Sequence, residues 1–233
     1  MSRRSPPATV TAIVPAHQAE RFLADAVASI LSQRPAVAEI LVVDDGSTDG
    51  TAEIARGMPE VRLVRQPPSG AGAARNAGGR AARGELLAFL DHDDLWLAGK
   101  LEAQLAAFEA EPSLDGVFTA IRNAYTAPEL EQRYRSAAGD RVAPHASTLL
   151  VRRASFLRAP PFDETLARAE FADWYARAVD AGLRFRVLED LFAVRRIHGA
   201  NTSIRLRADG LDFVRMARAR IAARRRRGSR ESD

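Results

Sequence analysis

The sequence predicts a single α/β domain in which a mostly parallel, Rossmann-like sheet is flanked by helices. Short β-branched apolar runs alternate four times with segments of helical periodicity over residues 10–110. Polar clusters follow three of these runs, where parallel strands would end at one edge of a sheet. The 233-residue chain is 46% hydrophobic, which suits one core, and it has no convincing linker. This alternation calls for parallel strands joined by right-handed crossovers.

The first half of the chain carries the regular alternation. Residues 10–14 read VTAIV, and the segment that follows places Leu23, Val27 and Ile30 at helical spacing. Residues 39–43 (EILVV) repeat the strand pattern before a polar turn. The expected strands are residues 10–14, 39–43, 61–64 and 85–90, and the expected helices are residues 20–33, 49–56, 71–82 and 97–110.

The second half is less regular, although it is expected to share the same core. Glu170 to Ala181 predicts a helix that Gly182 closes. We assign one domain to residues 8–204, with a ligand-binding half over 8–110 and a second half over 111–204, and a C-terminal helix and basic tail to residues 205–233. The further expected strands are residues 117–121, 147–151, 185–188 and 192–197, and the apolar stripe of the last helix comprises Leu211, Val214, Ala217 and Ile221.

Composition excludes several classes of protein. The absence of cysteine excludes disulfides, zinc–thiolate sites and thiol nucleophiles. The sequence pI of about 10.2 reflects ten arginines between Arg205 and Arg230, whereas residues 1–204 carry 24 basic against 26 acidic side chains. The body of the protein is therefore not a basic platform for nucleic acid.

The location expected from the sequence is the cytoplasm. The N-terminus lacks the apolar core of a signal peptide, and no later run approaches the ~18 apolar residues of a membrane span. The basic tail predicts peripheral contact with an anionic membrane surface; a C-terminal helix packed on the body with a solvated end is the alternative. Asn201-Thr202-Ser203 forms a glycosylation sequon, which is silent in a cytoplasmic protein and so requires another explanation.

A cation site is predicted after the fourth strand, where residues 91–94 read DHDD. An extended turn can aim the carboxylates of Asp91 and Asp93 at one ion. Hard oxygen ligands suit Mg²⁺ or Mn²⁺, which keep coordination places for diphosphate oxygens. The alternative is a solvated loop, or acids at a helix start, where they suit the positive end of the helix dipole.

Two further clusters are expected at the same edge of the sheet. Asp44 and Asp45 precede small residues that let a ligand approach the backbone, although they also suit an Asx turn with a helix cap. Residues 70–78 begin a helix but lack the third glycine of a dinucleotide fingerprint and follow the third strand, which argues against NAD. Arg75 and Asn76 offer a cation and an amide to a base or phosphate; a surface salt bridge is the alternative for Arg75.

Four motifs in this order and spacing resemble the nucleotide-binding half of the family 2 glycosyltransferases, whose fold is of the GT-A type: TAIVPAHQAE, VVDDGSTDGT, GAGAARNAG and GELLAFLDHDDLW. Residues 162–164 (FDE), the helix AEFADWYARA and the late RRIHGANTS are similar to the family's acceptor region. The resemblance covers about residues 10–203. It makes residues 8–110 the nucleotide-sugar-binding half and residues 111–204 the acceptor-side half.

The resemblance implies metal-assisted transfer of a sugar from a nucleotide donor, usually linked to uridine diphosphate, with inversion at the anomeric carbon. The implied cofactor is Mn²⁺ or Mg²⁺, with Asp93, His198 and Asp91 as its ligands. His17 stands where the family often has tyrosine. The donor-nucleotide site is expected to comprise Pro15, Ala16, His17, Glu20, Asp44, Asp45, Arg75, Asp91 and His92.

The catalytic base departs from the family pattern, which places an Asp after a Glu at the start of the acceptor helix. This chain has Glu170-Phe171, so we predict Glu170 as the base and keep Asp173 as the alternative. The Gln-x-x-Arg-Trp signature of processive synthases is absent, because QRYR at residues 132–135 lacks the Trp. A single sugar addition is therefore favoured.

Three rival functions were weighed against transfer. A Mg²⁺-dependent phosphatase or nucleotidyltransferase also uses Asp-x-Asp, but a phosphatase needs its nucleophilic Asp after the first strand, where residues 15–17 read PAH. A receiver-like domain would need an acid pair there as well. A degenerate, donor-binding module without activity is suggested by Phe171. No pattern specifies the donor sugar or the acceptor.

Overall fold

The computed structural model describes residues 8–135, 141–142 and 144–201. The expected C-terminal helix and basic tail at residues 205–233, and the membrane contact predicted for them, lie outside the described residues. In the part of the chain that is described, no helix combines the length and the apolar character of a membrane span.

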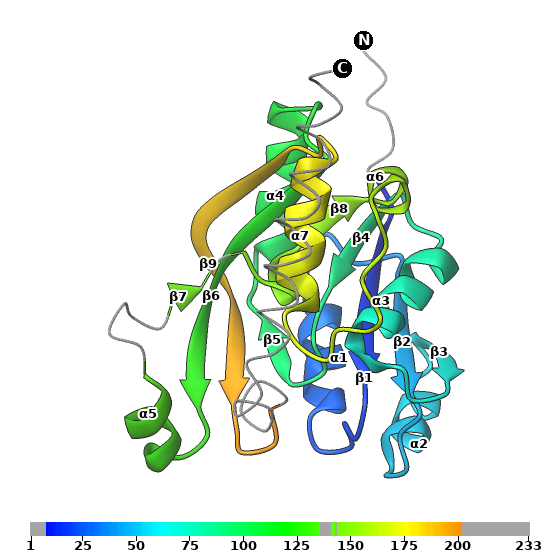
Figure 1. Ribbon diagram of the computed structural model, residues 1–233, viewed down its shortest axis with the longest axis vertical. Coiled ribbons are helices and arrows are strands. Elements are labelled where there is room, and N and C mark those ends of the chain that lie inside the picture. The colour runs from blue at the N-terminus through cyan, green and yellow to red at the C-terminus, as the bar shows by residue number, and fades with distance from the viewer. Residues whose placement is uncertain (1–7, 136–140, 143, 202–233) are drawn as a thin grey trace, which may run out of the picture.

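The first half of the chain forms the parallel part of the sheet, as the alternation predicts. The strands β1 (Val10–Ala16), β2 (Glu39–Asp45), β3 (Val61–Gln66) and β4 (Leu86–Phe89) lie in the order β3-β2-β1-β4 (Figure 1). All three neighbouring pairs are parallel. The intervening helices are α1 (Leu23–Leu31), α2 (Thr51–Arg56) and α3 (Gly70–Ala81).

The second half extends the same sheet beyond β4. The order continues β4-β8-β6-β9-β5, and β7 pairs with β6, so that both halves contribute to one nine-stranded sheet. The long strands β6 and β9 run side by side and curve strongly (Figure 1). These strands are β5 (Asp94–Trp96), β6 (Gly116–Tyr125), β7 (Arg141–Val142), β8 (Leu150–Arg152) and β9 (Phe185–Ile197). The helices of this half are α4 (Lys100–Ala110), α5 (Pro128–Tyr134), α6 (Arg153–Arg158) and α7 (Glu170–Asp180), with a 3-10 turn at Ala146–Thr148.

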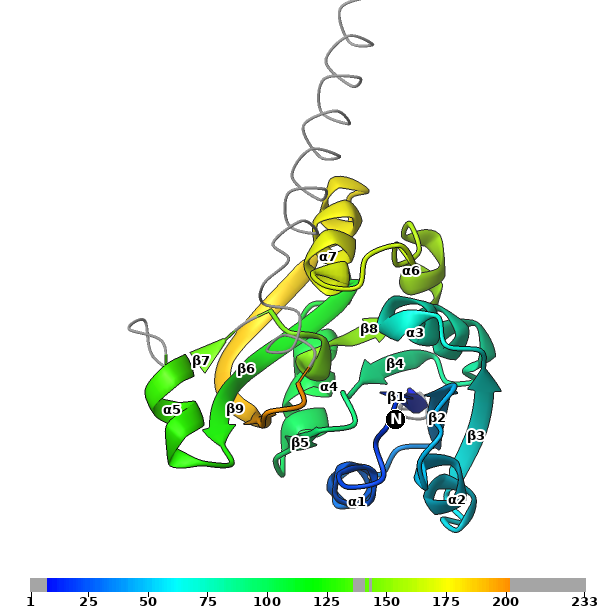
Figure 2. The same ribbon diagram turned by 60° about the horizontal axis from the view of Figure 1, so that its bottom comes forward.

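Helices cover both faces of the sheet (Figure 2). One core cluster packs α1, α2 and α4 against it through residues such as Leu23, Ala55 and Leu101. The other packs α3, α6 and α7, and Trp174 is fully buried in its centre. Because alternate strand residues point to opposite faces, the continuous apolar runs of the central strands feed both cores. The predicted α/β class, a single domain with a helix-flanked sheet, is confirmed.

Several element boundaries differ from those expected. The strand expected over residues 147–151 is a 3-10 turn at Ala146–Thr148 followed by β8 from Leu150. The helix expected over residues 97–110 begins at Lys100, because Asp94–Trp96 forms β5 against β9 and Gly99 takes a left-handed conformation with φ of 84°. The helix expected from residue 20 begins at Leu23, because the preceding turn is tied to the loop after β2: Ala19 N donates to Thr51 Oγ1 over 2.7 Å. The two strands expected over 185–197 are one strand, whose pairing with β6 continues through an irregularity near Phe118.

Candidate active site

The polar clusters that follow the strands meet at the carboxyl edge of the sheet. The register pairs Ala16 of β1 with Asp44 of β2, and Ile13 of β1 with Phe89 of β4, two residues before Asp91. Two polar contacts between a histidine ring and a backbone carbonyl connect the loops. His17 Nδ1 lies 2.9 Å from the carbonyl oxygen of Asp45, and His92 Nδ1 lies 3.2 Å from that of Pro15. The structure thus brings together the segments from which a donor site is predicted.

The acids after β2 hold the loops of this edge in place. Asp44 is fully buried and accepts hydrogen bonds from Arg65 Nε and Ser47 N over 2.8 and 2.9 Å. Burial raises the pKa of Asp44, but these hydrogen bonds and the charge of Arg65 outweigh it, so the pKa is lowered. Glu20 is exposed and accepts a hydrogen bond from Gly50 N.

Asp45 ties the end of β2 to the start of α3. One carboxylate oxygen accepts from Gln66 Nε2 and from Ser69 N, and the other accepts from Gly70 N over 2.7 Å. The side chain therefore satisfies free backbone donors at a helix start. This local role matches the capping alternative, and the carboxylate keeps further lone pairs for a ligand.

Arg75 lies between the two halves of the site. It is 3% exposed, and its two terminal nitrogens donate over 2.7 Å to Asp91 and over 2.7 Å to Glu170. Asp91 follows β4, whereas Glu170 begins α7, so one buried guanidinium joins the donor-side loop to the acceptor-side helix. Burial opposes ionisation of Asp91, but the charge of Arg75 outweighs it and lowers the pKa of Asp91. The ion pair is thus internal, and the surface salt bridge considered for Arg75 is wrong.

Asp93 and His198 come together from segments more than 100 residues apart. Asp93 Oδ2 lies 3.0 Å from His198 Nε2 and accepts a hydrogen bond from Asn201 Nδ2 over 2.8 Å. Burial would raise the pKa of Asp93, but the hydrogen bond from His198 and the nearby imidazoles lower it to about 2. Asp93 is therefore a carboxylate at neutral pH.

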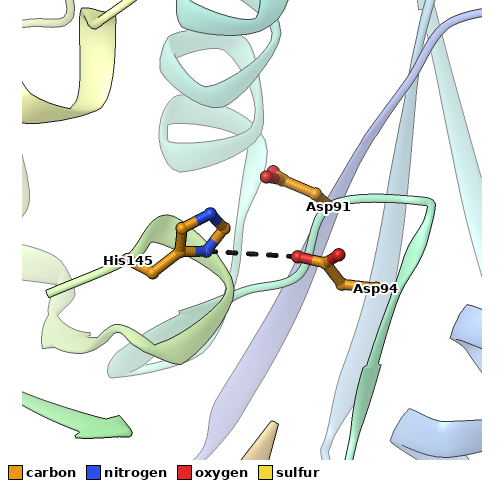
Figure 3. Close-up of side chains that lie close together, drawn as sticks. All are labelled: Asp91, Asp94 and His145. Carbon is orange, nitrogen blue, oxygen red and sulfur yellow. Dashed lines mark ion pairs between the residues drawn. The ribbon is translucent and has the colours of Figure 1, made fainter. Parts of the chain in front are cut away.

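Asp94 lies beside them in a different electrostatic setting. It is 1% exposed, accepts a hydrogen bond from Ser147 Oγ over 2.6 Å, and lies 4.0 Å from His145 Nδ1 (Figure 3). Burial and the charges of Asp93 and Asp91 raise the pKa of Asp94 well above its usual range. Burial likewise lowers the pKa of His145 to about 4. Both shifts disfavour the charged forms of Asp94 and His145.

Two sets of residues have the donor chemistry for a divalent cation. The first is Asp93 with His198, whose donor atoms are 3.0 Å apart, close to the ~3 Å between neighbouring ligands of an octahedral ion with bonds of about 2.1 Å. The second is Asp91, Asp94 and His145, which each offer an atom within 4.8 Å of the others. The first set is the tighter one, with 3.0 Å between Asp93 Oδ2 and His198 Nε2 against 4.0 Å between Asp94 and His145.

The side of the site that the sequence predicts for the acceptor is built on α7. Phe171, at the position where the family's base is expected, packs edge-on against Phe118 and lines an apolar pocket with Tyr175 and Val179. Asp173 is 5% exposed and is held by Arg177 over 2.7 Å. Trp174 is fully buried in the core and is stacked on Phe162. Glu170 is the carboxylate of α7 that contacts the donor-side loop.

Four residues of this region were not predicted as part of the site. Asp94 stood in the DHDD cluster without a role of its own, His145 belongs to a stretch with no recognisable pattern, and Ser147 was expected only as the start of a strand. Asn201 had a signal, because its sequon was left without a role. Asn76, predicted as a ligand-facing amide, instead bonds the backbone of Phe162 through both its donor and its acceptor.

The comparisons with known proteins identify the family. Residues 11–192 match the model of glycosyl transferase family 2, so the chain belongs to that family. An uncharacterized glycosyltransferase of Nostoc sp. is 32% identical over 212 residues, which cover 82% of this chain and 66% of that protein. Chondroitin synthase of Escherichia coli is 29% identical over 210 residues, covering 84% of this chain and 30% of the synthase. The chain thus spans less than two thirds of the length of these relatives.

A shorter match and two solved structures complete the comparison. The Escherichia coli protein WfgD, named as a UDP-Glc:α-D-GlcNAc-diphosphoundecaprenol β-1,3-glucosyltransferase, is 38% identical over 100 residues, or 42% of this chain and 40% of that one. The crystal structure of TarS from S. aureus has a TM-score of 0.66 at 22% identity, covering 91% of this chain and 64% of that chain. TarS with UDP-GlcNAc gives 0.65 at 22% identity, covering 84% and 60%. These structures confirm the predicted fold class.

The Arg75 bridge predicts a large loss of stability when the guanidinium is removed. Arg75→Met leaves two largely buried carboxylates without their cation, and we expect the free energy of unfolding at pH 7 to fall by about 3 kcal/mol. Because Arg75 lowers the pKa of Asp91, its contribution is present above the usual Asp pKa and diminishes as the pH falls below about 4. Urea unfolding at pH 7 and at a pH well below 4 measures both effects.

Arg56→Met is the matched control, since Arg56 pairs with Glu53 on the surface, where the two side chains are 53% and 71% exposed. Such a pair contributes at most about 1 kcal/mol. An equal loss in the two variants would contradict a special role for the buried bridge.

Proposed function

We propose that the protein is a glycosyltransferase that moves a sugar from a nucleotide-diphosphate sugar, with uridine diphosphate as the leaving group, to an acceptor hydroxyl with inversion. The observation that carries the proposal is the gathering of Asp91, Asp93 and Glu170 at the carboxyl edge of a family 2 sheet. The relatives support the donor class: WfgD is named for a UDP-glucose donor, and TarS has been crystallised with UDP-GlcNAc.

The donor lies, in this proposal, across the loops that follow β1, β2 and β4. Pro15, Ala16, His17 and Asp45 line the uracil side, and Asp91 meets the ribose. Arg75 is held between Asp91 and Glu170, so we assign it to orienting these carboxylates and to charge balance rather than to flanking the base. The remaining members of the donor set, Glu20, Asp44 and His92, hold the loops through the hydrogen bonds described above.

A divalent cation, Mn²⁺ or Mg²⁺, would be held by Asp93 and His198, with Asp91 at the ribose side. When bound, the cation neutralises charge on the diphosphate and so makes it a better leaving group. Asp93 contributes a carboxylate that is already ionised at neutral pH. His198 would offer the lone pair of its Nε2 to the cation.

Glu170 is proposed as the base. One of its oxygens accepts from Arg75, and the other is the oxygen that we assign to the acceptor hydroxyl. As Glu170 removes the hydroxyl proton, the acceptor oxygen forms a bond to the anomeric carbon from the side opposite the diphosphate. The bond from that carbon to the β-phosphate oxygen breaks, and the nucleoside diphosphate leaves with the electron pair.

A second candidate function follows from one observation. The position at which the family has its Asp base is occupied by Phe171, which packs in an aromatic cluster with Phe118 and Trp174. A module that binds the donor without transferring the sugar has the same donor-side loops. Release of nucleoside diphosphate from a nucleotide sugar distinguishes the two functions, because the module releases none.

The metal assignment predicts that uridine diphosphate binds at least about tenfold more tightly with Mn²⁺ than without it. Asp93→Ala removes that increment, because it removes an ionised ligand that the diphosphate cannot replace. Isothermal titration calorimetry with and without Mn²⁺ measures the increment. If Asp94→Asn or His145→Ala removes it while Asp93→Ala does not, the second ligand set is the metal site.

The base assignment predicts that Glu170→Gln lowers turnover by about 10²- to 10⁴-fold while donor binding is retained. The measurement is release of uridine diphosphate from a panel of its sugars at saturating donor, with water or an identified acceptor as nucleophile. Asp173→Asn is the matched control on the same helix, and we expect turnover to change less than about tenfold, since Asp173 is engaged by Arg177. The reverse ranking would make Asp173 the base.

A further inference from the structure

We propose that Asn201 is a positioning residue that holds Asp93 and His198 in the geometry a divalent cation requires. The inference rests on the proposed metal-assisted function and concerns a residue that supplies no ligand atom itself. It gives a role to the sequon residue that the sequence left unexplained.

The side chain of Asn201 is 6% exposed, and both ends of its amide are engaged. Its Nδ2 donates to Asp93 Oδ2 over 2.8 Å and to the carbonyl oxygen of Arg196 over 3.1 Å. Its Oδ1 accepts from the backbone N–H of His198 over 2.5 Å. One amide therefore fixes the carboxylate of Asp93 relative to the backbone that carries the His198 ring.

Neighbouring contacts hold the same two groups from other directions. The ring of His198 lies against Phe22, with centroids 4.5 Å apart. Arg196 Nε donates to the backbone oxygen of Asp93 over 2.6 Å. Asn201 contacts the carboxylate of Asp93 and the backbone of His198, so its removal leaves the direct contact between Asp93 and His198 to hold the two groups.

The orientation of the Asn201 side-chain amide shows that this residue can position the ligands but does not itself offer an atom to a metal. The NH₂ group that faces Asp93 has hydrogens and no lone pair for a metal. The oxygen that could bind a metal is directed to the His198 backbone instead. With a cation between His198 and Asp93, the hydrogen bonds of Asn201 to Asp93 Oδ2 and to the His198 backbone would still be available to hold both groups. Partners of this kind typically contribute 10- to 100-fold to metal affinity.

The buried position of Asn201 also decides the meaning of the sequon. A glycan on Nδ2 would displace the hydrogen bonds to Asp93 and Arg196. The hydrogen bonds of Asn201 thus give this residue a role in the site that does not depend on modification.

The test uses the full chain and measures Mn²⁺ binding by calorimetry with uridine diphosphate present at saturation. We expect Asn201→Ala to bind Mn²⁺ about 10- to 100-fold more weakly than the wild-type protein, with unchanged metal-free affinity for the nucleotide. Ser203→Ala is the matched control, because it destroys the sequon and leaves Asn201 in place; its Mn²⁺ affinity is expected to equal that of the wild type.

Thermal melting without metal separates positioning from a purely structural role, which would lower the melting temperature and leave the Mn²⁺ affinity of the folded protein unchanged. If Asn201→Ala does not fold, Asn201→Ser serves in its place, since a shorter hydroxyl side chain cannot bridge both groups. Mn²⁺ affinity within twofold of wild type in a folded variant overturns the inference. Absence of Mn²⁺ binding by the wild-type protein overturns the proposed metal dependence instead.

Discussion

Three aspartates within four residues, at a largely buried edge of the sheet, impose the constraint on which the rest of the site depends. Three adjacent negative charges cannot all be sustained there without compensation. Asp91 is compensated by the guanidinium of Arg75, and Asp93 by hydrogen bonds from His198 and Asn201. The pKa of Asp94 is raised by its burial and by the charges of Asp93 and Asp91. Asp91 is thus bridged to Arg75, Asp93 is held by His198 and Asn201, and Asp94 is hydrogen-bonded to Ser147.

The compensating groups come from distant parts of the chain, and this explains why both halves are needed. Arg75 lies on α3, His198 and Asn201 follow β9, and Glu170 begins α7, whereas the aspartates follow β4. These partners reach the edge because β9 belongs to the same sheet as β4, and because α3 and α7 pack on one face of that sheet. Arg75 in addition joins the donor-side loop to the acceptor-side helix through two ion pairs of 2.7 Å. The same two ion pairs therefore balance charge in the site and attach the second half of the chain to the first.

The sequence predicts the parallel first half well, because β1, β2 and β4 are continuous apolar runs whose ends are marked by polar clusters. It does not predict β5, since three residues are too few for a periodic signal and their partner strand lies about 100 residues later. The Arg75–Glu170 pair could not be predicted from the sequence for the same reason, because it joins residues 95 positions apart. Asn201 was singled out by its sequon, but its contacts with Asp93 and His198 depend on the path of β9. The local sequence pattern therefore predicted which edge of the sheet carries the candidate site. The residues that pair with its charged side chains depend on tertiary packing.

The central claim is that this edge of the sheet binds a nucleoside diphosphate together with a cation held by Asp93 and His198. Anomalous scattering from crystals grown with Mn²⁺ and uridine diphosphate tests it most directly, because the position of the metal is seen independently of any activity. The account predicts one strong manganese peak within about 2.2 Å of Asp93 and His198 donor atoms and in contact with the diphosphate. A peak centred on Asp91, Asp94 and His145, or bound nucleotide with no manganese beside it, would contradict the account.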